Sequence, residues 1–168
     1  MLSTTAAPRK EAGAPRRDRI ASILLAGLGA FVALATVGAL AATTHDAWVI
    51  GSFGASCVLL FGFPDVPFSR AKNVIGGHLL SSAVGLLFLH LLGPGWWAMA
   101  AAGACAAMLM MATDTVHPPA GSNPVIIFLS QPGWDFLVLP TLAGACVLVL
   151  LSRLYRFAIR CRAARRAA

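Results

Sequence analysis

The most restrictive feature of this sequence is the near absence of charge from its middle. The 133 residues from 20 to 152 carry only six charged side chains, whereas residues 1–19 carry seven and residues 153–168 carry six. Charged residues make up 11% of the whole chain, compared with roughly 25% in soluble domains. A chain with charged ends and a long apolar middle is typical of an integral membrane protein. This distribution excludes a soluble enzyme, a disordered regulator and a soluble nucleic-acid-binding protein.

Turn signals divide the apolar middle into six segments, which predict an all-α membrane protein with six transmembrane segments. The segments cover residues 20–42, 48–63, 73–92, 96–112, 117–130 and 135–157. The first segment is longer than the roughly 7–15 apolar residues of a signal peptide, so we expect it to be retained as a span. The second and fifth segments are shorter than the roughly 20 residues that a straight helix needs to cross a bilayer.

The positions of the thirteen Lys and Arg residues predict how the chain is oriented. Basic residues are retained on the cytoplasmic side of a membrane. With six passes, both basic tails and the loop that holds Arg70 and Lys72 fall on one face. We therefore expect both termini in the cytoplasm and the protein in the plasma (cell inner) membrane. A four-pass alternative, with the second and fifth segments re-entrant, places Arg70 and Lys72 on the outer face and ranks second.

An internal repeat at an offset of 67 residues divides the membrane domain into two halves. Val49, Gly54, Val58 and Phe61 recur as the same residue types 67 positions later, and the two short Gly-containing segments align without a gap. Each half contains three passes, so the second half is inverted in the membrane, as in many secondary transporters. The predicted organisation is a basic cytoplasmic tail at 1–19, a transmembrane domain at 20–157 with repeats at about 20–92 and 96–157, and a second basic cytoplasmic tail at 158–168.

The two short segments form the predicted substrate site. A helix that begins within the membrane presents unpaired N–H groups and a partial positive charge. Two such helix starts that face each other bind a small anion. The predicted substrate-binding residues are Ser52, Gly54, Ser56, His117, Pro118, Pro119, Gly121, Ser122 and Asn123. The alternative is that these small residues only allow close packing between helices.

Three further residues, Asp114, His78 and Lys72, are candidates for a proton relay or a gate. An acidic residue at membrane depth is costly and usually functional. Asp114 either orients His117, pairs with Lys72 or lies in a solvated loop. His117 either contacts the anion and moves a proton or only orients its turn. Lys72, together with Arg70, marks the cytoplasmic mouth, where basic side chains attract anions.

Three ordered motifs resemble those of the HPP family of integral membrane proteins. The motifs are Thr115–Gly121, which contains the His-Pro-Pro triplet that names the family, Asn73–His78 and Gly51–Gly62. The resemblance covers roughly residues 20–155. It implies a multi-pass membrane protein that acts as a transporter, and plastid and cyanobacterial members are linked to nitrite transport. This chain departs from the family pattern at Lys72, where an arginine is expected, and at residues 122–124, after the last glycine of the His-Pro-Pro motif.

Together these observations predict a transporter or channel for a small inorganic anion, with nitrite favoured over nitrate, formate and bicarbonate. A metal-cation carrier that uses His117, Asp114 and His78 is one alternative, but the few carboxylates argue against it. An intramembrane Ser–His enzyme is another, but the chain has neither a Gly-x-Ser-x-Gly elbow nor a His-Glu-x-x-His run. We therefore expect no enzymatic activity.

Few partners are expected beyond the substrate and the bilayer. The four cysteines form no Cys-x-x-Cys pair, so neither a metal site nor a disulfide framework is predicted, and no cofactor is expected. The expected partners are the anion, membrane lipids and, through stripes of small residues, a second copy of the chain in a homodimer. Nucleic acid is not an expected partner, because the basic tails suit anionic lipid head groups.

Overall fold

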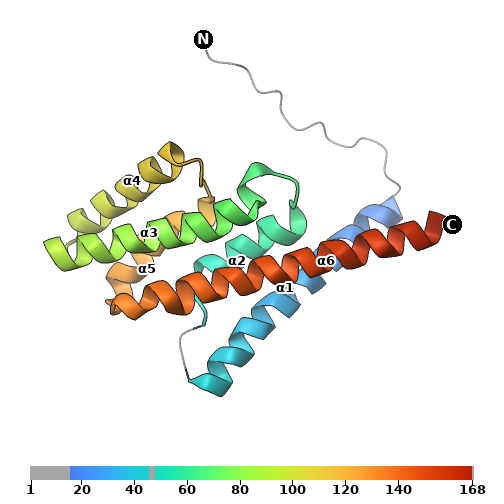
Figure 1. The fold of residues 1–168 in the computed structure, drawn as a ribbon, viewed down its shortest axis with the longest axis horizontal. Helices are drawn as coiled ribbons and strands as arrows, with labels where there is room; N and C mark the ends of the chain where they lie inside the picture. The colour runs from blue at the N-terminus through green and yellow to red at the C-terminus, as the bar shows by residue number, and fades with distance from the viewer. Residues whose placement is uncertain (1–15, 46–47, 168) are drawn as a thin grey trace, which may run out of the picture.

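The structure, a computed structural model, describes residues 16–45 and 48–167, and in that part of the chain it contains six α-helices and no strand (Figure 1). The α-helices are α1 (Arg16–Thr44), α2 (Ser52–Cys57), α3 (Ala71–Leu92), α4 (Trp96–Ala112), α5 (Asn123–Ser130) and α6 (Ala143–Ala167). Shorter 3₁₀ or π turns connect them: η1 (Val58–Gly62), η2 (Pro67–Ser69), η3 (Pro118–Ser122), η4 (Trp134–Leu137) and η5 (Val138–Leu142). The all-α fold predicted from the sequence is confirmed.

Three helical stretches are long and apolar enough to cross a membrane, as expected of a membrane protein. They are Arg19–Thr44, Ala71–Leu92 and Trp134–Arg162, and two shorter apolar stretches cover Ser52–Gly62 and Trp96–Ala112. The first stretch is the least embedded, because 17% of its most apolar part is buried, against 44% in the other two. A helix that is apolar all round and mostly uncovered by protein suits contact with lipid tails.

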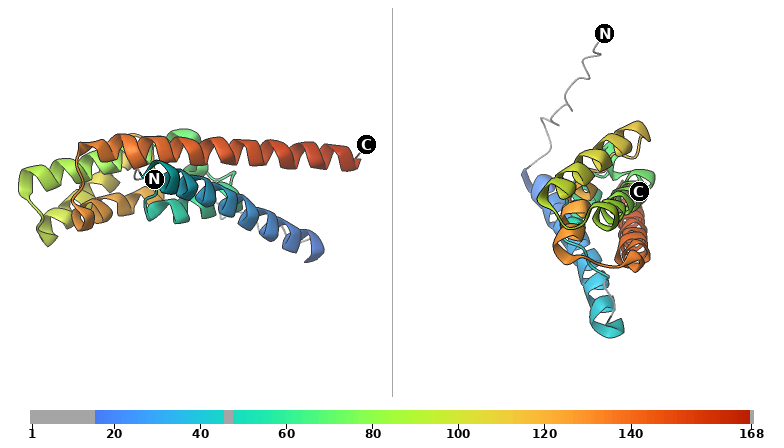
Figure 2. Two further views of the ribbon diagram at one scale, coloured as in Figure 1. Left: turned by 90° about the horizontal axis from the view of Figure 1, so that it is seen from below. Right: turned by 90° about the vertical axis from the view of Figure 1, so that its left-hand side faces the viewer.

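The helix α3 packs against most of the other elements and contributes to both apolar clusters of the core (Figures 1 and 2). The larger cluster joins α1, α2, α3, α5 and α6 around Phe53, Leu86 and Leu148. The smaller one lies between α3 and α4 and includes Phe128 of α5. Alanines at every fourth position of α4, Ala98, Ala102 and Ala106, are fully buried there. Small side chains along one face let two membrane helices approach closely.

The loop before α3 lies beside the arginine-rich part of α6. The Arg156 Nη2 atom lies 3.2 Å from Asp65 Oδ1, and Nη1 of the same residue donates to the Pro64 carbonyl. The N-terminal end of α1 and the C-terminal end of α6 also point the same way (Figure 2). Three parts of the chain therefore lie at the same end of the molecule: the start of α1, the loop that leads to Arg70, and the end of α6. This arrangement favours six passes over four, while the cytoplasmic location of that end stays a prediction.

The second and fifth apolar segments form short, irregular helices, as predicted. The helix α2 continues into η1, and α5 is preceded by η3, which has Pro118 and Pro119 in its first positions. Proline suits a helix start because it has no N–H to satisfy and its φ is already helical. The residue that follows α5, Gln131, has a left-handed backbone with φ 46° and ψ 53°. The relation of the two halves by an inverted repeat stays a prediction.

Candidate functional site

A cluster of polar side chains is buried where α2, α3, α5 and the segments before η3 and α6 meet. We call it the polar cluster; its members are Ser52, Ser56, His78, Ser82, His117, Asn123 and Thr141. Six of them are fully buried and Ser52 is 3% exposed. Polar side chains at this depth are costly unless they are paired. Among the described residues, every buried polar side-chain atom has a hydrogen-bond partner.

The two histidines of the polar cluster share the hydroxyl of Ser56. The Oγ atom of Ser56 lies 2.9 Å from Nε2 of His78 and 2.9 Å from Nε2 of His117. The Nδ1 atom of His117 lies 2.8 Å from the carbonyl oxygen of Phe68. A carbonyl only accepts, so Nδ1 carries the proton of the neutral ring and Nε2 is an acceptor. Ser56 therefore donates to His117 and accepts from His78.

Asn123 fixes the orientation of His78 from the other side. Its Nδ2 atom lies 3.1 Å from His78 Nδ1 and 2.9 Å from Ser82 Oγ, and its Oδ1 atom accepts from the Ser52 hydroxyl at 2.8 Å. An amide nitrogen only donates, so Nδ1 of His78 is an acceptor and its ring proton lies on Nε2. This assignment agrees with the donation from His78 to Ser56. Thr141 extends the network by donating to Ser82 at 3.1 Å.

Residues of α3 hold the His-Pro-Pro segment against the polar cluster. The Asn73 amide donates to the carbonyls of Val116 at 3.0 Å and Asp114 at 3.3 Å, and the Ser81 hydroxyl donates to the Ala120 carbonyl at 2.7 Å. Gly77 allows the close approach, because a Cβ there would lie 2.9 Å from the Thr115 carbonyl oxygen. The backbone around His117 is thus fixed at both ends, which positions its ring.

The structure brings together some of the predicted substrate-binding residues and leaves others apart. Ser52, Ser56, His117 and Asn123 are in the polar cluster, together with His78. The remaining five are not among its hydrogen-bonded members: Gly54, Pro118, Pro119, Gly121 and Ser122. Pro118 and Pro119 begin η3, and the Ser122 hydroxyl donates to the Pro119 carbonyl at 2.9 Å. A Cβ at Gly54 or Gly121 would meet no atom within 4 Å, so both positions have open space beside them.

Lys72 and Asp114 lie together in a separate, basic pocket. This pocket has a volume of about 330 Å³ and is lined by Pro67, Phe68, Arg70, Lys72, Asn73, Asp114 and Val116. Asp114 is exposed, in a left-handed turn with φ 53°. The Phe68 carbonyl, rather than the Asp114 carboxylate, contacts Nδ1 of His117. Since Phe68 also lines the pocket, a single residue connects the basic pocket to the polar cluster.

Sequence reasoning missed Ser82, Thr141 and the Phe68 carbonyl. Ser82 could have been predicted from the sequence, because it lies four residues after His78 and residues at that spacing share a helix face. Thr141 had no comparable signal, since it reaches the cluster from a segment distant in sequence. The Phe68 carbonyl is a backbone atom, and its residue type says nothing about its role.

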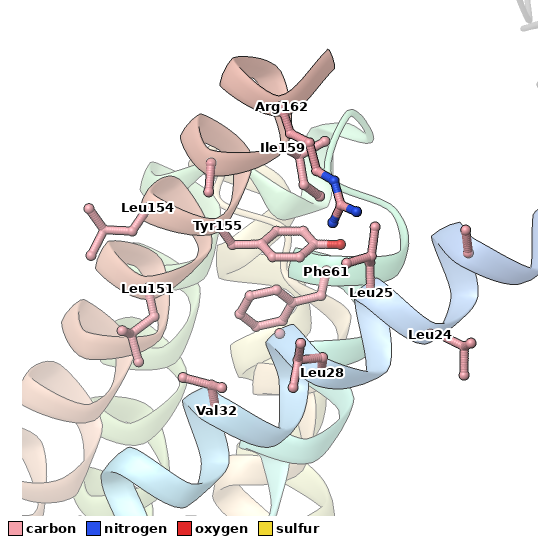
Figure 3. A pocket seen from close by; sticks show the side chains of 13 residues that line it. Leu24, Leu25, Leu28, Val32, Phe61, Leu151, Leu154, Tyr155, Ile159 and Arg162 are labelled. Carbon is pink, nitrogen blue, oxygen red and sulfur yellow. The ribbon is translucent and has the colours of Figure 1, made fainter. Parts of the chain in front are cut away.

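A second, apolar hollow in the described part of the chain contains none of the predicted site residues. It is an open groove of about 960 Å³ between α1 and α6, floored by Phe61 and Tyr155 (Figure 3). Leucine and isoleucine side chains form most of its walls, and Arg162 lies at one end. Its polar side chains are Tyr155 and Arg162, and the other lining residues are apolar or glycine, so the groove offers fewer donors to an inorganic anion than the polar cluster does. The polar cluster is therefore the better candidate site.

The positions of the His, Cys, Asp and Glu side chains are relevant to the alternative of a metal-cation carrier. Within residues 16–45 and 48–167, no three His, Cys, Asp or Glu side chains come together to hold a metal ion. Of the three residues named for such a carrier, His117 and His78 are neighbours with ring centroids 5.0 Å apart. Asp114 lies on the exposed side of the basic pocket.

The fold and the polar cluster define the class of protein: a membrane protein of several apolar helices with a hydrogen-bonded polar centre. The chain belongs to the HPP transmembrane family, because residues 15–164 match the family described as "HPP, transmembrane region". The family resemblance of the His-Pro-Pro motif is thereby confirmed. The matched residues extend a few positions beyond the predicted transmembrane domain at each end.

Two curated relatives are transmembrane proteins of Dictyostelium discoideum. One is 34% identical over 110 residues, which cover 61% of this chain and 39% of the relative. The other is 30% identical over 111 residues, which cover 61% of this chain and 36% of the relative. The chain therefore spans well under half the length of these relatives. No solved structure matches the chain significantly.

Proposed function

We propose that the protein transports a small inorganic anion across the membrane, with nitrite as the first candidate, and that it has no enzymatic activity and no resident cofactor. The observation that carries this proposal is the polar cluster, buried among apolar helices and connected through Phe68 to the basic pocket. Polar side chains inside a membrane are expensive and commonly mark a substrate pathway.

The basic pocket supports an anionic substrate. Arg70 and Lys72 are both exposed and line the pocket, where only Asp114 opposes them. Cationic side chains at the mouth of a pathway raise the local concentration of anions. We further propose that this mouth faces the cytoplasm of the cell, in the plasma membrane, with both termini on the same side.

The meeting of the two short segments supports a site in the polar cluster. The first residues of α2 and α5 are directly bonded, since the Ser52 hydroxyl donates to Asn123 Oδ1 at 2.8 Å. Hydroxyl, amide and imidazole N–H groups are suitable donors to an oxyanion. In the structure these donors satisfy one another, so an entering anion has to replace internal hydrogen bonds. Binding is therefore weak, on the order of 1 mM or about −4 kcal/mol, which suits rapid passage.

Anion uptake into proteoliposomes tests the function. Nitrite, nitrate, formate and bicarbonate are compared for the wild-type protein, for Ser52→Ala and for Ser130→Ala. Ser130 is the matched control, because it is an exposed serine of α5 that donates within its own helix. One hydrogen bond contributes about 0.5–1.5 kcal/mol, so Ser52→Ala should slow uptake about 2- to 10-fold, and Ser130→Ala should not. If wild-type vesicles take up none of the four anions faster than protein-free vesicles, the proposal is wrong.

A further inference from the structure

We propose that His117, Ser56 and His78 form a site for one exchangeable proton, and that this proton is loaded with the anion so that the pair crosses the membrane together. The inference rests on the proposed function, which it extends from anion transport to proton-coupled anion transport. It is argued from the directions of the hydrogen bonds in the polar cluster and from the distribution of permanent charge.

In the neutral state the hydrogen bonds run in one direction along the cluster. The Asn123 amide donates to His78 Nδ1, His78 Nε2 donates to Ser56, Ser56 donates to His117 Nε2, and His117 Nδ1 donates to the Phe68 carbonyl. Each ring therefore has one nitrogen without a proton: Nδ1 in His78 and Nε2 in His117. These two nitrogens are the places where an added proton can bind.

The Nε2 atom of His117 can take a proton without moving any heavy atom. The Ser56 hydroxyl lies 3.2 Å from the Ser52 carbonyl oxygen as well as 2.9 Å from His117 Nε2. When a proton binds to Nε2 of His117, the Ser56 O–H rotates to donate to the Ser52 carbonyl. Its oxygen then accepts from both imidazole rings through its two lone pairs. One N–H bond forms as a hydronium ion from the aqueous side gives up its proton and becomes water. No covalent bond within the protein breaks, and the cluster gains one positive charge.

The Nδ1 atom of His78 does not offer the same possibility. It faces the Asn123 amide nitrogen at 3.1 Å, which cannot become an acceptor. Protonation there requires the Asn123 amide to turn over. This rotation reverses the bonds to Ser52 and Ser82 and replaces the donation to the His78 carbonyl oxygen, now 3.3 Å from Nδ2, with a repulsive contact between two oxygens. The geometry therefore assigns the added proton to His117. The second ring, 5.0 Å away, stays neutral because two like charges at that distance repel strongly.

No permanent charge lies in the polar cluster to compete with this proton. The titratable side chain that α2 contributes is the buried Cys57 thiol. From α5 and η5 the cluster contains the Asn123 amide and the Thr141 hydroxyl, neither of which is charged. At the start of α3 and in the segment before η3, the charged groups are Lys72 and Asp114, which line the basic pocket with Arg70.

The distribution of charge explains why a proton is needed. The sequence has no Lys or Arg between Asn73 and Ser152, so the site has no fixed cation to balance a bound anion. A proton on His117 provides that positive charge only while the anion is present. The cluster is neutral when empty and, together with its substrate, neutral again when loaded. This arrangement avoids an unbalanced charge inside the membrane in either state.

Nitrogen-15 NMR of histidine-labelled protein in nanodiscs tests the proton site without any transport. At neutral pH we expect His117 as the Nδ1–H tautomer and His78 as the Nε2–H tautomer, and on acidification one proton should bind at Nε2 of His117. His117→Gln assigns the signal, and His90→Gln is the matched control because His90 is an exposed residue of α3. If His117 is the Nε2–H tautomer, or if His78 is protonated first, the inference is wrong.

Proteoliposomes with a pH dye inside test the coupling. An inward nitrite gradient should acidify the wild-type interior by one proton per anion, faster than in protein-free vesicles, which report leakage of the free acid. Potassium with valinomycin should not accelerate uptake, because the coupled step moves no net charge. Ser56→Ala should reduce acidification and uptake together, whereas Ser130→Ala should change neither.

The outcomes separate the two proposals. Anion uptake that is accelerated by valinomycin and brings in no protons overturns proton coupling and leaves anion transport in place. No uptake of any of the four anions overturns the proposed transport and the coupling with it, and the NMR titration then decides on the proton site alone.

Discussion

The substitution Gly77→Ala should displace His117, and Gly76→Ala one position earlier provides a matched control. A Cβ on Gly77 would lie 2.8 Å from His117 Cβ and 2.9 Å from the Thr115 carbonyl oxygen. Both distances are too short, and the carbonyl is backbone, so it cannot rotate away. A Cβ on Gly76 would meet Thr115 Cγ2 at 3.1 Å, and this methyl group can move by a few tenths of an ångström.

The two substitutions gain the same helix propensity, so their difference isolates the clash. Alanine is favoured over glycine inside a helix by about 1 kcal/mol. Overpacking costs about 1–3 kcal/mol and applies to Gly77→Ala. The two variants should therefore differ by about 1–3 kcal/mol in the free energy of unfolding. At roughly 2–4 °C per kcal/mol for a chain of this size, Gly77→Ala should unfold several degrees below Gly76→Ala.

Transport should separate the variants further. Moving His117 lengthens its hydrogen bonds to Ser56 and to the Phe68 carbonyl, each of which contributes about 0.5–1.5 kcal/mol. Loss of both corresponds to about a tenfold slower uptake or more. The assays are thermal unfolding in one detergent and anion uptake normalised to reconstituted protein. Equal unfolding temperatures and equal uptake for the two variants would refute the close approach of α3 to His117.

Three further results are expected. A cysteine introduced as Arg70→Cys should react with an impermeant thiol reagent in inverted membranes but not in intact cells, and labelling of intact cells would contradict the six-pass topology. Gly54→Val and Gly121→Val should fold normally, since a Cβ at either glycine meets no atom within 4 Å. Neither glycine belongs to the polar cluster, so both variants should keep uptake close to wild type, and loss of uptake by a normally folded variant would place the anion at these helix starts instead. Asp65→Asn removes the ion pair with Arg156. It should change the free energy of unfolding by less than about 1 kcal/mol, because the Asp65 side chain is 88% exposed. A larger loss of stability in a thermal melt would show that this contact stabilises the bundle.

The membrane class and the helical fold could be predicted because they depend on composition and segment length. The short second and fifth segments were also recognisable, since glycine and proline interrupt them. Four of the nine predicted substrate-binding residues, Ser52, Ser56, His117 and Asn123, do meet in the polar cluster. They were found because polar residues are conspicuous in an apolar sequence.

The rest of the site depends on which way each residue faces in the folded chain, and the order of residues in the sequence does not reveal this. Ser52 and Ser56 are four residues apart and share one face of their helix, whereas Gly54 between them points the other way and is exposed. Asp114 was considered a membrane-depth acid, but the turn that follows α4 carries it into the basic pocket. The partner that orients His117 is a backbone carbonyl, for which no residue type gives a signal.

The polar cluster also determines how this protein can be assembled in the membrane. Its members come from both halves of the sequence, so His78 and Ser82 enter the bilayer on α3 before Asn123 and Thr141 have been synthesised, and Ser56 is the one hydrogen-bond partner of His78 in the cluster that is already present. Until α5 and Thr141 arrive, Nδ1 of His78 lacks the Asn123 amide, and the Ser82 hydroxyl lacks both Asn123 and Thr141. The first half alone therefore contains an incomplete polar cluster. We expect the fold to become stable only when the last third of the chain has been inserted. We therefore expect folding to be cooperative between the two halves, and either half expressed separately should be a substrate for membrane quality control.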